Sequence, residues 1–360
     1  MKPNESASVT VSDVARAAGV SVGTVSRVLN GFPNVTPENL KRVQKSINAL
    51  GYRKCESAGL LRARRHGSVA RSGNIGTIFM EMSDVWSSHP LFGAYATGIE
   101  QACQELGFHS LIEFCDDSDI LPRCVRERKV DGLLVKAIRR VPAFLQRIPP
   151  AFPVVCFGLN DPTASIHQVS IDHQGAGWLV TDYLWSRGHR RIAFLSCDSL
   201  HPIFSARLNG YENFLRGKGA FDPALVAVKP KIAPSVNDPD ETPPDMTQLL
   251  EQVTSGSSAE RFTAIVVAND WMACGLYSAL VDKGTSIPDE VSVVGFDNSE
   301  LVCNTMTPPL SSYAAPFSEL ARAAAMELID RIEHPDRPRS GAIQLLRGNI
   351  VERSSVRSLS

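Results

Sequence analysis

The chain has 360 residues, of which 43% are hydrophobic and 21% are charged, and its formal net charge is −1 at pH 7. This composition is typical of a globular protein and excludes fibrous and intrinsically disordered chains, while the length predicts two or three domains. The charge is unevenly distributed, because residues 1–72 contain twelve Lys or Arg and four Asp or Glu, and residues 73–360 therefore carry −9. A basic segment joined to an acidic body indicates a nucleic-acid binder linked to a domain with another role.

Targeting signals and a disulfide framework are not expected from the sequence. Residues 1–9 contain no apolar run typical of a signal peptide, and no later stretch reaches eighteen uninterrupted apolar residues. The eight cysteines are scattered without a Cys-x-x-Cys pair, which favours reduced thiols over disulfides or a zinc site. We therefore expect a cytoplasmic protein without a membrane span.

Residues 10–29 predict two short helices separated by a tight turn. Val14, Ala15 and Ala18 share one helical face, and Gly19 can take the positive φ that ends a helix. Ser21 is a suitable N-cap for the second helix. The apolar positions expected in that second helix are Val25, Val28 and Leu29.

A third helix is predicted after Thr36 and Pro37, which supply a capping hydroxyl and a proline in the first turn. Its predicted apolar side consists of Leu40, Val43, Ile47 and Leu50, and Gly51 closes it. Three short helices with a glycine turn between the first two are the pattern of a helix-turn-helix DNA-binding head. The basic charge favours this over a small helical domain that packs on another domain.

Several of these segments match one protein family. Val14-Ala15, Ala18-Gly19-Val20-Ser21, the run from Thr24 to Asn30, and Gly51-Tyr52 resemble the head-piece of the lactose/galactose repressor (LacI-type) family of bacterial transcription regulators. The resemblance implies an all-α helix-turn-helix head with a hinge, followed by an α/β two-lobed domain like periplasmic binding proteins. The corresponding boundaries are 1–52 for the head, 53–72 for the hinge and 73–360 for an effector-binding and dimerisation domain.

The second helix is the one that this motif places in the DNA major groove. Val22 and Gly23 occupy positions that usually read base edges, and they offer only apolar contact, for instance with a thymine methyl group. Arg27 can contact guanine O6 and N7, and it is the main candidate for base-specific reading. The short polar side chains of Ser21, Thr24, Asn30 and Thr36 suit phosphate oxygens. Thr24 and Ser26 have an alternative role as exposed helix residues, and Tyr52 completes the candidates within the head.

Residues 53–72 are a basic tether by composition alone. The resemblance implies a hinge helix here that inserts a leucine into the minor groove, and Ala58 and Leu61 match the family's alanine and leucine. An apolar wedge of this kind partly unstacks a base step and bends DNA. The sequence departs from the family at Lys54 and Cys55, where Pro-Asn is usual, and Gly59 weakens the helix by about 1 kcal/mol relative to Ala.

From Asn74 onward, short apolar runs alternate with amphipathic segments, which predicts parallel sheets covered by helices on both faces. About ten strands are more than a single sheet usually contains, which suggests two lobes. The resemblance implies that the chain crosses between these lobes more than once. A proline-rich segment at 229–244 predicts a surface loop. The predicted strands are 75–80, 109–114, 130–135, 154–157, 166–171, 191–195, 262–268, 291–296, 310–314 and 343–351, and the predicted helices include 92–106, 176–187, 206–216, 272–283 and 318–331.

The resemblance also implies an effector site between the lobes. Asn269 and Asp297 follow apolar strands and Arg207 lies in a helix after another, and ligands of open α/β sheets bind at such carboxyl ends. Phe92 and Phe317 are weaker candidates. A turn role competes for Asp297, and for Asp270 we expect a helix N-cap. Gly158 stands where the family frequently has an aspartate, so one expected contact with a sugar hydroxyl is missing.

An enzyme is not expected. The sequence lacks Gly-x-x-x-x-Gly-Lys-Ser/Thr, His-Glu-x-x-His and Gly-x-Ser-x-Gly, its histidines lack metal spacing, and Gly175-Ala176-Gly177 looks like ordinary helix-start packing. We predict no catalytic residue, metal or cofactor. The predicted partners are a pseudo-palindromic DNA operator, a sugar-like small-molecule effector and a second copy of the chain. Two alternatives remain open: an architectural DNA binder without effector control, and a sugar-binding or sugar-processing protein without DNA function.

Overall fold

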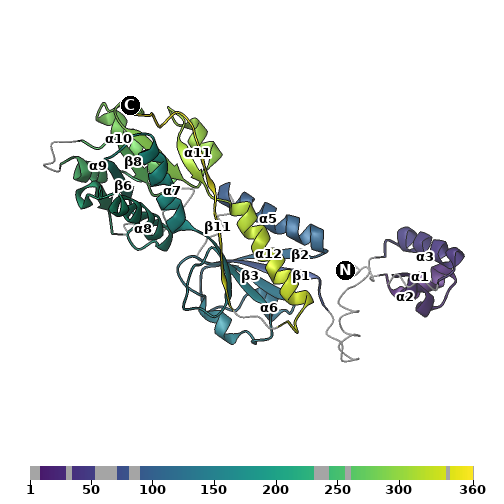
Figure 1. Cartoon of the computed structure of the whole chain (residues 1–360). Helices are drawn as coiled ribbons and strands as arrows, with labels where there is room; N and C mark the ends of the chain where they lie inside the picture. Colours follow the sequence, from purple (N-terminus) through teal and green to yellow (C-terminus); the bar gives the residue numbers. More distant parts are fainter. Residues whose placement is uncertain are drawn as a thin grey trace, which may run out of the picture. The chain divides into compact units, whose positions relative to one another are not determined.

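The computed structural model describes residues 9–29, 35–52, 71–80, 90–230, 243–255, 261–337 and 341–359. The chain separates into two compact units, Met1–Ser72 and Gly73–Ser360 (Figure 1). Each unit has hydrophobic core residues of its own. The predicted hinge lies outside the described residues except for 71–72, and Asn30, Ala58, Leu61 and most of the proline-rich segment also lie outside them.

The first unit contains the three predicted helices, which are α1 (Val11–Ala18), α2 (Val22–Leu29) and α3 (Pro37–Leu50). Thr10 and Asp13 form a reciprocal capping box at the start of α1. Gly19 ends α1 with a φ of 62°, a conformation that glycine adopts without steric cost. The core of this unit consists of Val14, Ala15, Ala18, Val25 and Val43.

The buried side of α3 is narrower than predicted. Val43 is buried and Ile47 packs against the core, but Leu40 and Leu50 are 38% and 36% exposed. Leu40 and Leu50 therefore lie at the exposed edge of the predicted apolar side of α3. α1 and α2 have eight residues each, whereas α3 has fourteen.

The second unit is built on two six-stranded sheets, and each defines a lobe. The first lobe contains β1 (Asn74–Met80), β2 (His109–Cys115), β3 (Gly132–Lys136), β4 (Val154–Phe157), β5 (His167–Ile171) and β11 (Ile343–Leu346), in the order β11-β5-β4-β3-β1-β2. The second lobe contains β6 (Ile192–Ser196), β7 (Val226–Val228), β8 (Ala264–Val267), β9 (Ser292–Phe296), β10 (Ser311–Ala314) and β12 (Asn349–Val351), in the order β12-β10-β9-β8-β6-β7.

The chain passes between the lobes after β5, after β10 and between β11 and β12. This confirms the expectation that it crosses more than once. The single strand predicted at 343–351 is wrong, because the chain changes lobes at Arg347-Gly348 and forms one strand in each sheet. Gly348 is needed there, since an added β-carbon would collide with the Ala314 carbonyl. β12 runs antiparallel to β10, so the expectation of purely parallel sheets fails at this pair.

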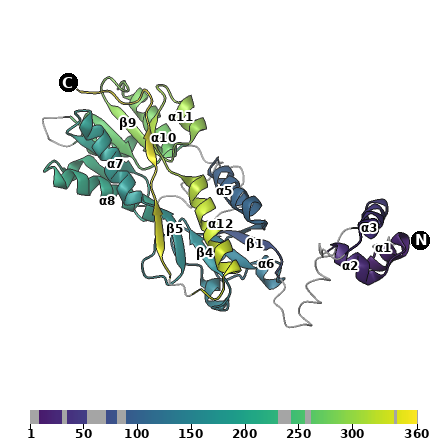
Figure 2. The ribbon, with the colours of Figure 1, turned by 45° about the vertical axis from the view of Figure 1, so that its right-hand side comes forward.

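Helices cover the sheets of both lobes (Figure 2). In the first lobe α5 (Pro90–Leu106) packs against α12 (Phe317–Glu333), and in the second α7 (His173–Ser186) packs against α8 (Pro202–Gly217). Gly177 and Gly210 bring the α7 and α8 backbones together, because a β-carbon on either would strike the facing helix. This confirms the packing role expected of Gly175-Ala176-Gly177. The other helices in the described ranges are α6 (Arg123–Arg126), α9 (Thr247–Thr254), α10 (Asp270–Asp282) and α11 (Glu300–Thr305), with the 3₁₀ turns η2 (Ala143–Arg147) and η3 (Pro223–Leu225).

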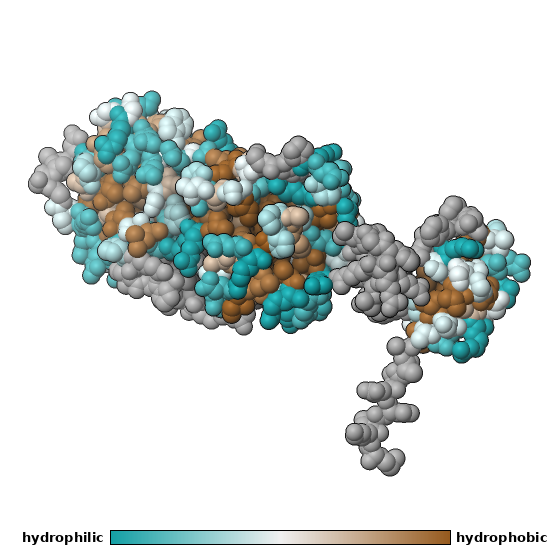
Figure 3. Space-filling model, turned by 90° about the horizontal axis from the view of Figure 1, so that it is seen from below, coloured by the Kyte–Doolittle hydropathy of each residue, from teal (hydrophilic) through white to brown (hydrophobic). Residues whose placement is uncertain are grey.

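The surface of the second unit mixes hydrophilic and hydrophobic side chains, and the hydrophobic ones gather toward the middle of the face shown in Figure 3. The most exposed large hydrophobic side chains of this unit include Leu200, Val281 and Leu301, which are 69%, 70% and 71% exposed. Within the described residues, no helix combines the length and apolar character needed to cross a bilayer.

Candidate functional site

Six of the eleven predicted DNA-binding residues lie on α2 or directly before it. Ser21, Val22, Gly23 and Arg27 are exposed, whereas Thr24 and Ser26 are half-buried. Ser21 caps α2 as predicted, since its Oγ accepts from Thr24 N at 3.1 Å and lies 2.9 Å from Thr24 Oγ1. Val22 is 42% exposed, which leaves an apolar side chain at the start of the helix.

Arg27 is an exposed cation in the last turn of α2, with no ion pair to any residue in the described part of the chain. Arg16 on α1, by contrast, is paired with Asp13 at 3.1 Å. Thr36 accepts from Asn39 N at 3.4 Å as the N-cap of α3, and Tyr52 packs partly against the core of the unit. Arg42 joins α3 to the turn between α1 and α2 by donating to the Gly19 carbonyl at 3.4 Å.

A cavity lies where strands of both lobes end. The first lobe and its helices contribute Leu91, Tyr95, Lys136, Ile138 and Phe317, and the second lobe and its helices contribute His173, His201, Ile203, Phe204, Arg207, Asn269 and Asp297. Lys136 is the last residue of β3, Asn269 follows β8 and Asp297 follows β9. The cavity is therefore at the carboxyl ends of the strands, where open α/β sheets bind ligands.

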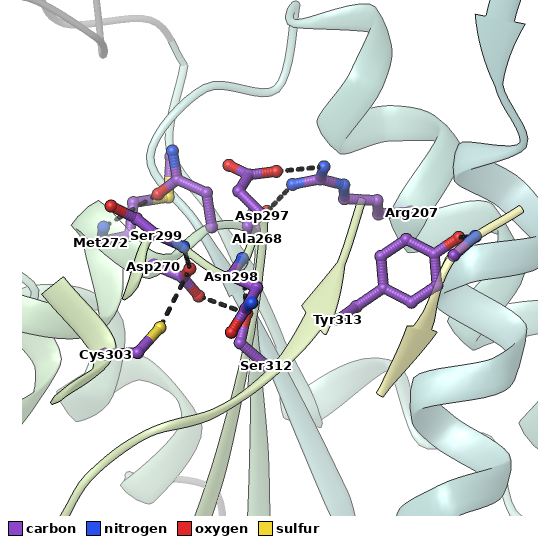
Figure 4. A network of polar contacts seen from close by, with 12 residues as sticks. Arg207, Ala268, Asp270, Met272, Asp297, Asn298, Ser299, Cys303, Ser312 and Tyr313 are labelled. Carbon is purple, nitrogen blue, oxygen red and sulfur yellow. Dashed lines mark hydrogen bonds and ion pairs between the residues drawn. The ribbon is translucent and has the colours of Figure 1, made fainter. Parts of the chain in front are cut away.

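Arg207, Asn269 and Asp297 are brought together at this cavity. Arg207 donates from Nη2 to Asp297 Oδ1 at 2.6 Å and from Nη1 to the Ala268 carbonyl at 2.6 Å (Figure 4). Its guanidinium also lies 4.5 Å from the centroid of the Phe296 ring. Asp297 keeps a second carboxylate oxygen for which no partner is found among the described residues, so it can accept from a ligand hydroxyl.

The N-cap of α10 is Asn269 rather than Asp270. Asn269 Oδ1 accepts from Met272 N at 2.8 Å, so the role predicted for Asp270 is wrong. Asp270 instead accepts from Ser312 Oγ, Ser299 N and Cys303 Sγ at 2.7, 2.9 and 3.3 Å, beneath the loop that carries Asp297 (Figure 4). Burial, and secondarily the charge of Asp297, raises the pKa of Asp270 to about 7.

The two phenylalanines predicted for the effector site differ in position. Phe317 lines the cavity at the start of α12, beside Tyr95 at a ring distance of 5.5 Å. Phe92 is not among the described residues that line it, because its ring packs 5.2 Å from Phe79 and 5.8 Å from Phe114 in the first lobe. Its neighbours Leu91 and Tyr95 line the cavity instead.

Sequence reasoning missed three titratable residues of the cavity: Lys136, His173 and His201. Burial lowers the pKa of His201 to about 3, with Arg139 adding to the effect. Burial also lowers the pKa of His173 well below its usual value. Both imidazoles are therefore neutral at pH 7. In the sequence, the one signal for these three residues was that each follows an apolar stretch predicted to be a strand. No group of residues suited to hold a metal ion occurs in the described ranges.

Two family models match the chain. Residues 10–54 match the bacterial regulatory proteins of the lacI family, and residues 181–356 match a periplasmic binding protein-like domain. The HTH-type transcriptional regulator GalR of Escherichia coli K12 is 30% identical over 337 residues, which cover 88% of this chain and 87% of GalR. The chain belongs to the lacI family of bacterial regulatory proteins. It is a DNA-binding transcriptional regulator, and the relatives that it matches are regulators rather than enzymes.

Solved structures of this lacI-family architecture cover nearly the whole chain. The lac repressor dimer bound to operator and an anti-inducer superposes with a TM-score of 0.77 and 22% identity, covering 98% of this chain and all of that one. A complex of the transcriptional regulator CelR with cellobiose superposes with a TM-score of 0.64 and 26% identity, covering 96% and 99% of the two chains. These likenesses confirm the predicted fold class of a helix-turn-helix head and a two-lobed α/β domain.

Proposed function

We propose that this regulator is a sequence-specific repressor whose affinity for an operator changes when a small molecule binds in the cavity between its lobes. The observation that carries the proposal is the Arg207–Asp297 pair, which presents a carboxylate to a cavity lined from both lobes. A ligand that contacts both lobes favours one arrangement of them over another. In a chain with a lacI-family head, that preference is the means of control.

In the proposed domain organisation, residues 1–52 bind DNA, residues 53–72 form a hinge, and residues 73–360 bind the effector and form the dimer. Arg27 reads a guanine, Val22 and Gly23 make apolar contact with base edges, and Ser21, Thr24, Asn30 and Thr36 hold phosphates. Ser26 and Tyr52 extend this surface, and Ala58 and Leu61 act in the minor groove. The exposure of Val22 and the unpaired guanidinium of Arg27 among the described residues support the base-reading part.

We further propose that the chain works as a homodimer in the cytoplasm. One head reads only a few base pairs, and a two-fold symmetric dimer matches a pseudo-palindromic operator. The lac repressor, whose fold this chain shares, binds its operator as a dimer in its crystal structure. Val281 and Leu301, on α10 and α11 of the second lobe, are large apolar side chains left exposed in the single chain.

The proposed effector is sugar-like, and Arg207, Asn269, Asp297 and Phe317 are its candidate contacts. Carboxylate, amide and guanidinium groups suit hydroxyl recognition, and the aromatic ring suits the apolar face of a sugar. CelR, which was solved with cellobiose, supports this class of ligand. No catalytic step, metal or cofactor is part of the proposal, and Phe92 is kept only as a support for the cavity wall.

The proposal is tested with DNA from upstream of the chain's own coding region. Fluorescence anisotropy should show specific binding, and log K against log salt should have a slope near −9 if two heads make about ten phosphate contacts. A slope shallower than about −3 would show single-head binding and contradict the dimer. Binding to random DNA with equal affinity would contradict sequence-specific repression.

A further inference from the structure

Lys136 is a buried cation in the wall of the cavity. It ends β3 in the middle of the first sheet, in register with Phe79 on β1 and Phe157 on β4. Its side chain is 2% exposed, and it lines the same cavity as Arg207 and Asp297. A lysine is almost never buried to this extent without a partner.

No partner of that kind is found in the described part of the chain. Lys136 makes no hydrogen bond or ion pair there, and its Nζ lies 5.5 Å from the Tyr95 ring centroid and 5.9 Å from that of Phe157. Burial is the only cause found for the pKa of Lys136, which it lowers to about 7, and no described carboxylate offsets it. The aromatic faces compensate only part of the cost of removing an ammonium group from water.

Gly158 keeps the space that the ammonium group occupies. It follows β4 with a φ of 77°, and a β-carbon added there would collide with Lys136 Nζ. Any larger residue at 158 would therefore displace the lysine as well as strain the backbone. The lack of a side chain at Gly158 thus leaves room for the ammonium group in the cavity wall.

Among the described residues that line the cavity, Asp297 is the one carboxylate, and Arg207 already neutralises it. Burial keeps His173 and His201 neutral at pH 7. Three buried nitrogens of this wall have no hydrogen-bond partner in the described ranges: Arg207 Nε, His173 Nδ1 and His201 Nδ1. Arg207 Nε can only donate, and the imidazole nitrogens can take either role, so the wall has more donor than acceptor capacity.

We propose that the cavity takes a small hydroxylated organic anion, with its carboxylate or phosphate on Lys136 and a hydroxyl on the second carboxylate oxygen of Asp297. This inference rests on the proposed function and narrows its ligand class from sugar-like molecules in general to sugar acids or sugar phosphates. The anion supplies the charge that Lys136 lacks, and charge-assisted hydrogen bonds to an oxyanion are the strongest that this wall can form. A neutral sugar would leave the ammonium group uncompensated.

The first test measures whether Lys136 stabilises the ligand-free fold or destabilises it, as expected of a residue kept for ligand binding. Lys136→Met keeps the length of the side chain but removes the charge, so the ligand-free full-length variant should melt higher than wild type by about 2 °C or more. Lys129→Met, on an exposed residue paired with Glu127, is the matched control and should change little. A lower melting temperature for Lys136→Met would show a structural lysine and overturn the inference.

The sign of the pH dependence gives a second readout on the same variant. Below pH 7 Lys136 is charged in both the folded and unfolded states, so its burial penalty is fully present. As pH rises from 7 to about 10 the unfolded state alone keeps the proton, and the penalty disappears. The difference in melting temperature between Lys136→Met and wild type should therefore decrease over this range. A difference that stays constant would contradict an uncompensated ammonium group. The other charged or titratable groups of the cavity are Tyr95, His173, His201, Arg207 and Asp297, which are common to both proteins.

The ligand test compares matched probes at equal ionic strength in chloride: phosphate, acetate, D-gluconate against D-glucose, and ribose 5-phosphate against ribose. The anions should raise the melting temperature of wild type more than their neutral counterparts and have no such effect on Lys136→Met. The gluconate and ribose 5-phosphate arms distinguish a carboxylate from a phosphate. If no anion raises the melting temperature of wild type above its value in chloride alone, the inference is wrong.

Two outcomes separate this inference from the function on which it rests. Stabilisation by glucose or ribose that is lost in Asp297→Asn but kept in Lys136→Met would overturn the anion and leave effector control intact. Anion binding that requires Lys136 but leaves operator affinity unchanged, for every anion bound, would support the anion site and overturn effector control.

Discussion

Arg207 Nη2 and Asp297 Oδ1 lie 2.6 Å apart, although 90 residues separate them in the sequence. The pair joins α8 to the loop after β9, where Asp297 has a φ of 98°. Such a backbone conformation costs a residue other than glycine about 1–3 kcal/mol and persists only where its surroundings hold it. Here Arg207 holds the side chain, and the Asp297 amide donates to the Tyr313 carbonyl at 2.9 Å. The carboxylate is thus fixed at the cavity before any ligand arrives.

Asp297→Asn is nearly isosteric and should remove the response to effector while keeping operator binding. Arg207 is 1% exposed, so weakening its partner should lower the free energy of unfolding by about 1–3 kcal/mol. Chemical denaturation measures that loss. Arg207→Ala should also remove the response, because it deletes the planar guanidinium group, whose paired hydrogen bonds even a lysine could not replace. If both variants kept a normal effector-induced shift in operator affinity, the effector site would lie elsewhere.

Arg27→Ala should weaken binding to the preferred operator by about 1–3 kcal/mol and relax discrimination at one base pair per half-site. Arg16→Ala is the matched control, since Arg16 is an exposed arginine of the same unit that is already paired with Asp13. Competition assays against single-base operator variants measure the effect. Equal weakening on operator and random DNA would identify Arg27 as a phosphate contact instead.

The minor-groove role proposed for Leu61 makes a different prediction. Leu61→Ala should reduce operator bending and specificity but leave much of the non-specific binding intact, because phosphate contacts are unchanged. Circular-permutation gel shifts report the bend. A variant that bends the operator as wild type does would remove Leu61 from the interface.

Asp270 predicts a pH-dependent stability. Its folded-state pKa is raised to about 7 from an ordinary 3.8, so between these values the folded state binds more protons than the unfolded state. Its contribution to stability is therefore most favourable below pH 3.8, falls as pH rises, and is lowest above pH 7. Asp270→Asn lacks this titration, so wild type should lose stability relative to the variant as pH rises from 4 to 7. A difference that is independent of pH would contradict the assignment.

Helix packing near the site is tested by two glycines of α8. Gly210→Ala should lower stability by about 1–3 kcal/mol and disturb Arg207, because its β-carbon would strike the α7 backbone. Gly217→Ala meets nothing within 4 Å and should be neutral or stabilise by up to about 1 kcal/mol. Thermal unfolding of both variants checks the contrast, and similar losses in the two would argue against close α7–α8 contact.

The sequence was sufficient to predict the helix-turn-helix head and most strands, because apolar periodicity and capping residues are local signals. The family resemblance, together with their places after strands, predicted Arg207, Asn269 and Asp297, and the structure brings these three to one cavity. It could not predict that Asn269 rather than Asp270 caps α10, since both residues suit the role. Lys136 was missed because its burial depends on contacts from β4 and α5, which no local pattern reveals. The break at Arg347-Gly348 was missed because both halves read as strand.

The central claim is that a ligand in the cavity controls the affinity of the head for DNA. Its most direct test is fluorescence anisotropy of wild type and Asp297→Asn on operator DNA, with and without gluconate or ribose 5-phosphate, whichever stabilises wild type more. We predict that the ligand changes the dissociation constant of wild type for operator by about fivefold or more and leaves that of Asp297→Asn unchanged. An unchanged wild-type dissociation constant at saturating ligand, or the same shift in both proteins, would contradict it.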